Sequence, residues 1–151
     1  MPTLPWTTPN PATPGAQAYA MASRFQVASL ADVPRFFLSS LAAWRQVRSA
    51  PGCLGASLVA RPLRREFCTL SAWENRDALY AFARTQPHRD IMTQLRPTMA
   101  SSTFTFWEVG AGDLPLSWED AQRRLVAQAC ADRAATSQQI PGGALGQPSG
   151  A

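Results

Sequence analysis

Hydrophobic and polar positions divide the central part of the chain into strands and helices. Four segments alternate between apolar and polar or small residues, as strands with one buried face do. These segments are residues 18–27, 53–60, 66–73 and 102–109. A stripe with helical spacing begins near Val33 and ends at Pro51-Gly52, and two shorter helical segments follow Asn75 and Pro87. The order β-α-β-β-α-β predicts an α+β, ferredoxin-like antiparallel sheet with its helices on one face.

The predicted strands carry large apolar residues on both faces. In the third strand, one face holds four residues and the other holds three. The first set is Phe67, Thr69, Ser71 and Trp73, and the second is Cys68, Leu70 and Ala72. Helices on one face would leave the other in water, and an exposed apolar patch of that size implies a partner surface.

The segments outside this core differ in composition. Residues 1–16 are rich in proline and threonine, which predicts an extended N-terminal arm with Leu4 and Trp6 available for docking. The core domain spans residues 17–110. A C-terminal helix is expected within residues 111–135, capped by Ser117, with Trp118, Ala121, Leu125 and Val126 on its packing face. Residues 136–151 are small and polar, and we expect a disordered tail.

Composition narrows the class of protein. The 151 residues suit one domain, and the 46% apolar content suits a globular protein. No apolar run approaches a membrane span and the first residues lack a signal-peptide pattern, so a soluble, cytoplasmic chain without a membrane partner is expected. The net charge is +4, but the arginines are scattered. Their local cluster, Arg61, Arg64 and Arg65, falls in a predicted hairpin loop, which favours a solvated loop over nucleic-acid binding.

The cysteines and short motifs argue against several kinds of chemistry. Cys53, Cys68 and Cys130 show no metal-ligand spacing, and the first two lie in predicted strands as small core residues. The chain has no GxGxxG, P-loop or HExxH motif. We therefore predict neither a metal site nor a nucleotide cofactor.

One stretch combines residues that suit a site. Trp73 ends the third strand, and His88, the single histidine, shares a helical face with Ile91, Met92 and Leu95. Arg96 lies eight residues beyond His88, on nearly the same side. Trp73, His88 and Arg96 are the candidate site residues. Each also has a structural alternative. Trp73 could be a packing residue, His88 a hydrogen-bonded core residue, and Arg96 a cation that interacts favourably with the dipole at a helix end.

The same stretch resembles a known family. The patterns SAWE, DAL..F and PHR..M, with the turn PGCLGASL before them and the strand TFTFWEV after them, resemble the antibiotic-biosynthesis-monooxygenase-like family of dimeric α/β barrels. The resemblance covers roughly residues 18–110, and a distant similarity extends to the spheroidene-monooxygenase-like branch. It implies a homodimer whose two sheets close around each other into a barrel.

The resemblance also implies a function. Family members often oxidise aromatic polyketides without metal or flavin, so a small aromatic or hydrophobic substrate and no cofactor are expected. His88 would then assist proton removal, Trp73 would form an aromatic wall, and Arg96 would pair with a phenolate or with reduced oxygen. Two alternatives stay open. One is a haem-binding barrel with His88 as the axial ligand, although Phe82 and Met92 stand where the haem-degrading branch has tryptophan and histidine. The other is a non-catalytic ligand-binding accessory protein.

Overall fold

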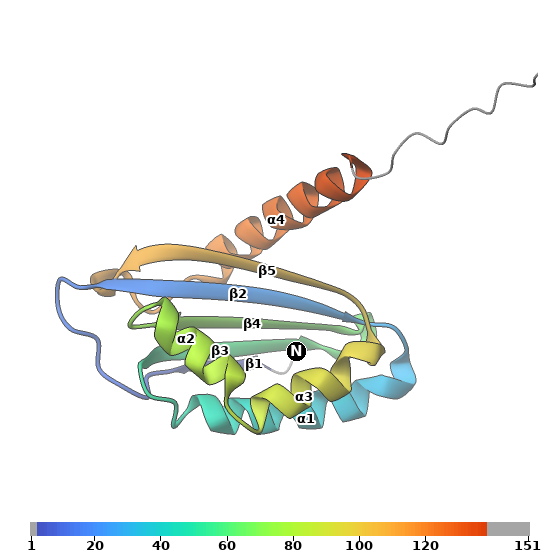
Figure 1. The fold of residues 1–151 in the computed structure, drawn as a ribbon, viewed down its shortest axis with the longest axis horizontal. Helices are drawn as coiled ribbons and strands as arrows, with labels where there is room; N and C mark the ends of the chain where they lie inside the picture. The colour runs from blue at the N-terminus through green and yellow to red at the C-terminus, as the bar shows by residue number, and fades with distance from the viewer. Residues whose placement is uncertain (1–2, 139–151) are drawn as a thin grey trace, which may run out of the picture.

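The computed structural model describes residues 3–138, which form a five-stranded antiparallel sheet with helices on both faces (Figure 1). The strands are β1 (Thr3–Thr7), β2 (Gln17–Val27), β3 (Cys53–Arg61), β4 (Glu66–Trp73) and β5 (Met99–Gly110). The helices are α1 (Val33–Val47), α2 (Arg76–Arg84), α3 (His88–Leu95) and α4 (Trp118–Gln138). The strand order is β1-β3-β4-β2-β5. The predicted α+β, ferredoxin-like arrangement of β2–β5 is confirmed.

Helices α1, α2 and α3 lie on one face of the sheet (Figure 1). Their junction with the sheet is aromatic, since the Phe36 ring of α1 lies 4.6 Å from that of Phe67 on β4 and 5.8 Å from that of Phe25 on β2. Asn75 caps α2 by accepting a hydrogen bond from the Ala78 amide at 2.9 Å. Leu95 of α3 packs in the same cluster as Phe36, so α1 and α3 share one core on this face.

The N-terminal arm adds a strand at the sheet edge. Residues 3–7 form β1, which pairs antiparallel with β3. Pro5 cannot donate to a ladder, so an edge position is the one that β1 can take. The Trp6 ring packs against Gly55 in β3, at a spot where a side chain would overlap it. The Asn10 amide donates to the carbonyls of Ala50 and Cys53 at 3.1 and 3.0 Å, which anchors the rest of the arm.

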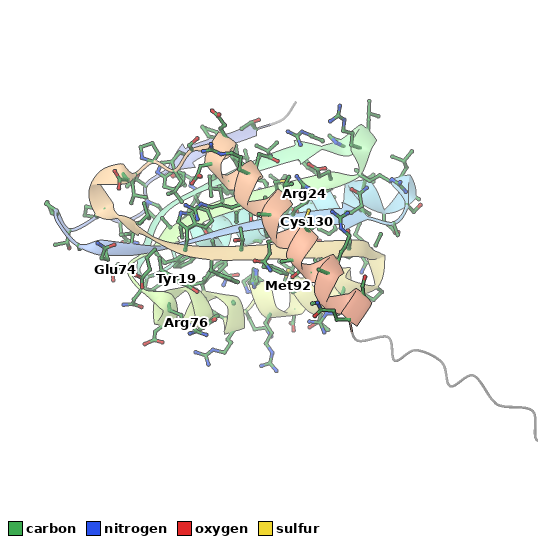
Figure 2. All side chains as sticks on the ribbon, turned by 90° about the horizontal axis from the view of Figure 1, so that it is seen from above. Tyr19, Arg24, Glu74, Arg76, Met92 and Cys130 are labelled. Carbon is green, nitrogen blue, oxygen red and sulfur yellow. The ribbon has the colours of Figure 1, made fainter. Side chains whose placement is uncertain are left out.

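The second sheet face is covered by α4, which crosses β5 diagonally in Figure 2. Ala121 and Leu125 of α4 are fully buried against Ala22 and Leu70. Trp107 packs in the same cluster, and the Arg124 guanidinium lies 4.5 Å from its ring centre. Helix α4 of the same chain therefore covers this face, and the homodimer stays a prediction.

Helix α4 differs from its predicted form at its far end. It runs to Gln138, three residues into the segment expected to be disordered. Val126 was predicted to pack but is 52% exposed, whereas its neighbour Leu125 is fully buried against the sheet. The remainder of the predicted tail, 139–151, lies outside the described residues. Within residues 3–138, no helix has both the length and the apolar character of a membrane span.

Candidate active site

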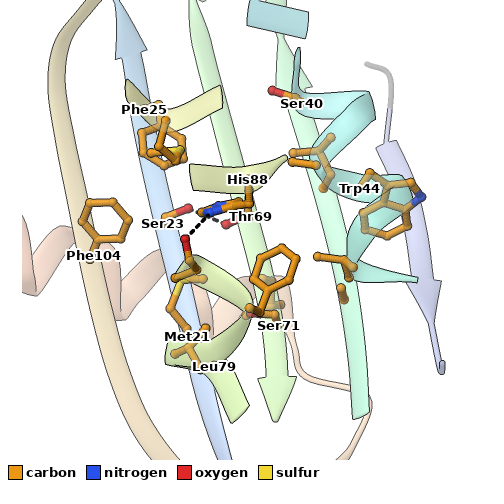
Figure 3. Close-up of a pocket in the computed structure, with 18 of the residues that line it drawn as sticks. Met21, Ser23, Phe25, Ser40, Trp44, Thr69, Ser71, Leu79, His88 and Phe104 are labelled. Atoms are coloured by element: carbon orange, nitrogen blue, oxygen red, sulfur yellow. Dashed lines mark hydrogen bonds between the residues drawn. The ribbon is translucent and has the colours of Figure 1, made fainter. Parts of the chain in front are cut away.

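A cavity of about 200 Å³ lies between the sheet and helices α1, α2 and α3 (Figure 3). The helices contribute mainly apolar side chains to its wall, among them Phe36, Trp44, Leu79, Phe82, Ile91 and Met92. On the sheet side, Phe104 and Phe106 of the edge strand β5 line it while remaining 40% and 43% exposed. The cavity is therefore apolar in its interior and reaches the surface beside β5.

Trp73 and His88 both line this cavity. Trp73 is 1% exposed at the end of β4, and its indole N–H donates to the Ser71 hydroxyl at 2.9 Å. The Phe82 ring lies between the two residues, with its centre 5.1 Å from Trp73 and 4.7 Å from His88. The three rings form one continuous aromatic wall, which suits a flat apolar ligand.

The protonation of His88 follows from its hydrogen bond. Nδ1 lies 3.1 Å from the carbonyl oxygen of Ala83, and a carbonyl can only accept, so Nδ1 carries the proton. In the neutral ring, Nε2 then has a free lone pair. Burial lowers the pKa of His88 below its ordinary value of 6.5, and the bond to Ala83 offsets this only in part. The imidazole is therefore neutral near neutral pH and able to accept a proton through Nε2.

Three hydroxyl groups on the sheet wall were missed in the sequence. Ser23 on β2 lies directly opposite Thr69 on β4, and their hydroxyls are hydrogen-bonded to each other (Figure 3). The third, Ser71, accepts from Trp73 and keeps its own proton free to donate. All three interrupt apolar faces between large residues such as Phe67 and Trp73. A hydroxyl in the middle of an otherwise apolar strand face indicates a polar group in a cavity. The alternation of residues along the strand did not by itself point to these three.

Arg96 does not line this cavity. Helix α3 ends at Leu95, and Arg96 begins a 3-10 turn that directs the chain into β5. It lines a neighbouring hollow instead, together with Ser101 and Ser102. The structure thus brings Trp73 and His88 together and separates Arg96 from them, because eight residues of helix place Arg96 about 12 Å further along the axis than His88.

The residues present do not suit a metal or a reactive thiol. Within residues 3–138, no three His, Cys, Asp or Glu side chains cluster as metal ligands would. Burial raises the pKa of Cys53 and of Cys68 to about 11, so both are protonated thiols near neutral pH. Their predicted role as core residues agrees with this burial.

The cavity lining also fits haem poorly. His88 Nε2 is a possible axial ligand. However, no arginine from the described part of the chain lines the cavity to pair with haem propionates. Its volume is also below the roughly 300–1,000 Å³ of typical small-molecule sites. The lining instead suits a smaller, flat and largely apolar molecule with hydroxyl or keto groups.

Comparisons with known proteins give a family match over part of the chain and a fold. Residues 36–94 match the family model of antibiotic biosynthesis monooxygenases. No curated protein sequence matches the chain. A candidate antibiotic biosynthesis monooxygenase from Nitrosomonas europaea has a TM-score of 0.55 and 16% identity, and the alignment covers 70% of this chain and 99% of that one. A similar candidate from Caulobacter crescentus CB15 has a TM-score of 0.53 and 21% identity, over 62% and 89% of the two chains.

A third solved structure is a variant of SnoaB from Streptomyces nogalater, a cofactor-independent oxygenase. Its TM-score is 0.51 at 15% identity, covering 60% of this chain and 90% of that one. At these identities the structural likeness shows the fold alone. The similarity to the spheroidene-monooxygenase-like branch stays a prediction. The resemblance to the main family is confirmed: residues 36–94 carry the antibiotic biosynthesis monooxygenase pattern, on the fold of solved structures of that kind.

Proposed function

We propose that this protein is a cofactor-independent monooxygenase that oxidises a small aromatic, polyketide-type molecule. The observation that carries the proposal is His88, a half-buried neutral imidazole that lines an apolar, aromatic-walled cavity and whose Nδ1 is held by Ala83, so that the lone pair of Nε2 is free. The match to the monooxygenase family model and the cofactor-independent activity of SnoaB support the same class of reaction.

The first step is proton transfer. A phenol or anthrone-type substrate lies flat against the wall of Trp73, Phe82 and His88, with its acidic proton toward Nε2. His88 accepts this proton and becomes an imidazolium, which the Ala83 carbonyl stabilises through Nδ1–H. The hydroxyls of Ser71 and of the Ser23–Thr69 pair lie on the sheet wall and donate to the developing oxyanion.

Oxidation follows from the electron-rich anion. The substrate anion transfers electrons to dioxygen and forms a carbon–oxygen bond, which gives a hydroperoxide after protonation. Loss of water from the hydroperoxide leaves a carbonyl group. One oxygen atom enters the product, the other leaves as water, and both hydrogens of that water come from the substrate. The apolar lining excludes bulk water while this intermediate exists.

The homodimer expected from the resemblance remains part of this proposal. Because α4 covers the outer sheet face, a second copy could meet that face only if α4 moved away from its own sheet. The cavity itself is built from one chain among the described residues, so the proposed chemistry does not require the partner.

Oxygen uptake with an anthrone-type substrate tests the proposal. The parent protein should consume oxygen and form the quinone without added metal or flavin. His88→Phe keeps the aromatic volume and removes the base, so kcat should fall by about 100-fold or more. Arg89→Gln, an exposed residue on the same helix, is the matched control and should leave the rate unchanged. Binding without oxygen uptake would favour the accessory-protein alternative, and full activity of His88→Phe would refute the role of His88.

A further inference from the structure

A second hollow adjoins the aromatic cavity. It is formed where α3 leads into β5, and its polar members are Arg96, Ser101 and Ser102. Its remaining lining residues are Phe25, Met92, Met99, Ala100 and Phe104. No aspartate or glutamate from residues 3–138 lines it, so the Arg96 guanidinium is the one charged group in its wall.

The two hollows share a wall. Phe25, Met92 and Phe104 line both of them, and the Phe25 and Phe104 rings meet edge to face with centres 5.5 Å apart. Met92 is half-buried and unbranched, and such a side chain changes rotamer at little cost. A ligand that displaces Met92 would therefore extend from the aromatic cavity into the second hollow.

The chemistry of the second hollow is that of an anion site. A guanidinium offers several N–H donors in a plane that matches a carboxylate, and the Ser102 hydroxyl adds a further donor. The aromatic cavity contains no cation of this kind among its described lining residues, since His88 is neutral. The charge beside the cavity would then discriminate between substrates that are otherwise equally flat and apolar.

We propose that this hollow, through Arg96 and Ser102, binds the carboxylate of a substrate whose aromatic rings occupy the main cavity; Ser102 lies opposite Phe25 on the cavity face of β5, whereas the side chain of Ser101 is on the other face. The substrate class is accordingly an aromatic acid with the carboxylate on a short side chain. The inference rests on the proposed function in one respect, namely that the main cavity holds the rings. It changes the predicted role of Arg96 from contact with the reacting atoms to selection of the substrate.

Binding of a matched ligand pair tests this inference without turnover. Naphthylacetate and naphthylacetamide have the same rings and the same shape, and they differ in charge. Calorimetry or quenching of tryptophan fluorescence should show that the parent protein binds the acid about tenfold more tightly than the amide, the size of one hydrogen-bonded charge. Arg96→Gln should remove this preference and leave the affinity for the amide unchanged. Ser102→Ala should reduce it in part, and Ser101→Ala, on the other face of β5, should not.

The controls separate this inference from the proposed function. Arg89→Gln removes an exposed arginine from the same helix and should keep the preference for the acid, which excludes a general effect of net charge. Equal affinity of the parent for acid and amide would overturn the anion site and leave the aromatic cavity standing. A preference that survives Arg96→Gln would overturn the assignment of Arg96. Failure of the parent to bind either ligand would overturn the inference together with the proposed function.

Discussion

At the residue scale, the chemistry of the cavity depends on one hydrogen bond. The Ala83 carbonyl fixes the proton on Nδ1 of His88, so that Nε2 remains a base. The same burial that keeps the ring neutral makes Nε2 a weaker base than an exposed imidazole. The hydroxyls of Ser71 and of the Ser23–Thr69 pair compensate for this weakness, because they stabilise the anion that proton transfer creates.

The lowered pKa of His88 has a consequence for stability. In the unfolded chain His88 titrates near 6.5, and in the folded protein it binds its proton only at lower pH. The folded state therefore holds fewer protons between these two values, and its free energy of unfolding falls as the pH drops through about 6.5. Melting temperatures measured from about pH 8 to about pH 5 should show this loss in the parent. In His88→Phe the loss should be smaller, and identical pH profiles would mean that His88 is not desolvated.

The sequence identified some residues of the cavity and not others. Trp73 and His88 were found because each is rare and stands at the end of an element. Ser23, Thr69 and Ser71 were not found, because serine and threonine are common in strands and only the fold shows which face becomes a cavity wall. Arg96 was misplaced, because a shared helical side does not bring together two residues that are about 12 Å apart along the axis.

At the element scale, α4 is held by its first half. Leu125 is fully buried against the outer sheet face, and its neighbour Val126 is 52% exposed. Leu125→Ala should lower the free energy of unfolding by about 2–5 kcal/mol, as truncation of buried leucine does. Val126→Ala is the adjacent control and should cost about 0.5 kcal/mol or less. Chemical denaturation measures both, and equal effects would mean that α4 is not packed as described.

The arm that carries β1 depends on a glycine. A Cβ at residue 55 would overlap the Trp6 ring, so Gly55→Ala should displace Trp6 and loosen the pairing of β1 with β3. Hydrogen exchange of the β1 amides should become faster while exchange in β4 is unchanged. Gly112→Ala is the control, since a Cβ there meets open space. Unchanged exchange in β1 of Gly55→Ala would contradict this packing.

The predicted strands and helices agree with the structure where periodicity is strong. The predicted strand at residues 66–73 coincides with β4, and the helix from Val33 with α1. Strand β1 was missed, because its five residues include Pro5 and lie in a proline-rich segment, which predicts an extended arm without a paired strand. The end of α4 was placed too early, because its last residues are small and polar, and such residues indicate neither a helix nor a tail.

At the scale of the whole molecule, the two faces of the sheet have different roles. One face, with α1, α2 and α3, contains the cavity, and the other face is sealed by α4 and Trp6. The sequence showed that both faces are apolar, but the chain order does not reveal which face a terminal helix will cover. For this reason the need for cover was predicted correctly, whereas the sequence did not show that α4 supplies it.

The sealing of the outer face predicts the effect of removing α4. A chain that ends at Leu116 would expose Leu70, Ala22 and Trp107 to water. An exposed apolar patch of this kind favours association with other copies. Light scattering should then give a larger particle mass for the shortened chain than for the full chain at the same concentration. A shortened chain that keeps the mass of one copy and melts at the parent temperature would show that α4 contributes nothing to this face.

The most direct test of the central claim is whether the cavity removes a proton from a bound phenol. A hydroxyanthraquinone is a suitable probe, because its phenol and phenolate forms absorb at different wavelengths. Bound to the parent at a pH below its own pKa, the probe should show the phenolate spectrum, since Nε2 of His88 takes the proton and the sheet hydroxyls hold the anion. Bound to His88→Phe, it should show the phenol spectrum. A neutral phenol spectrum in the saturated parent, or a phenolate spectrum that persists in His88→Phe, would contradict the assignment of His88 as the base.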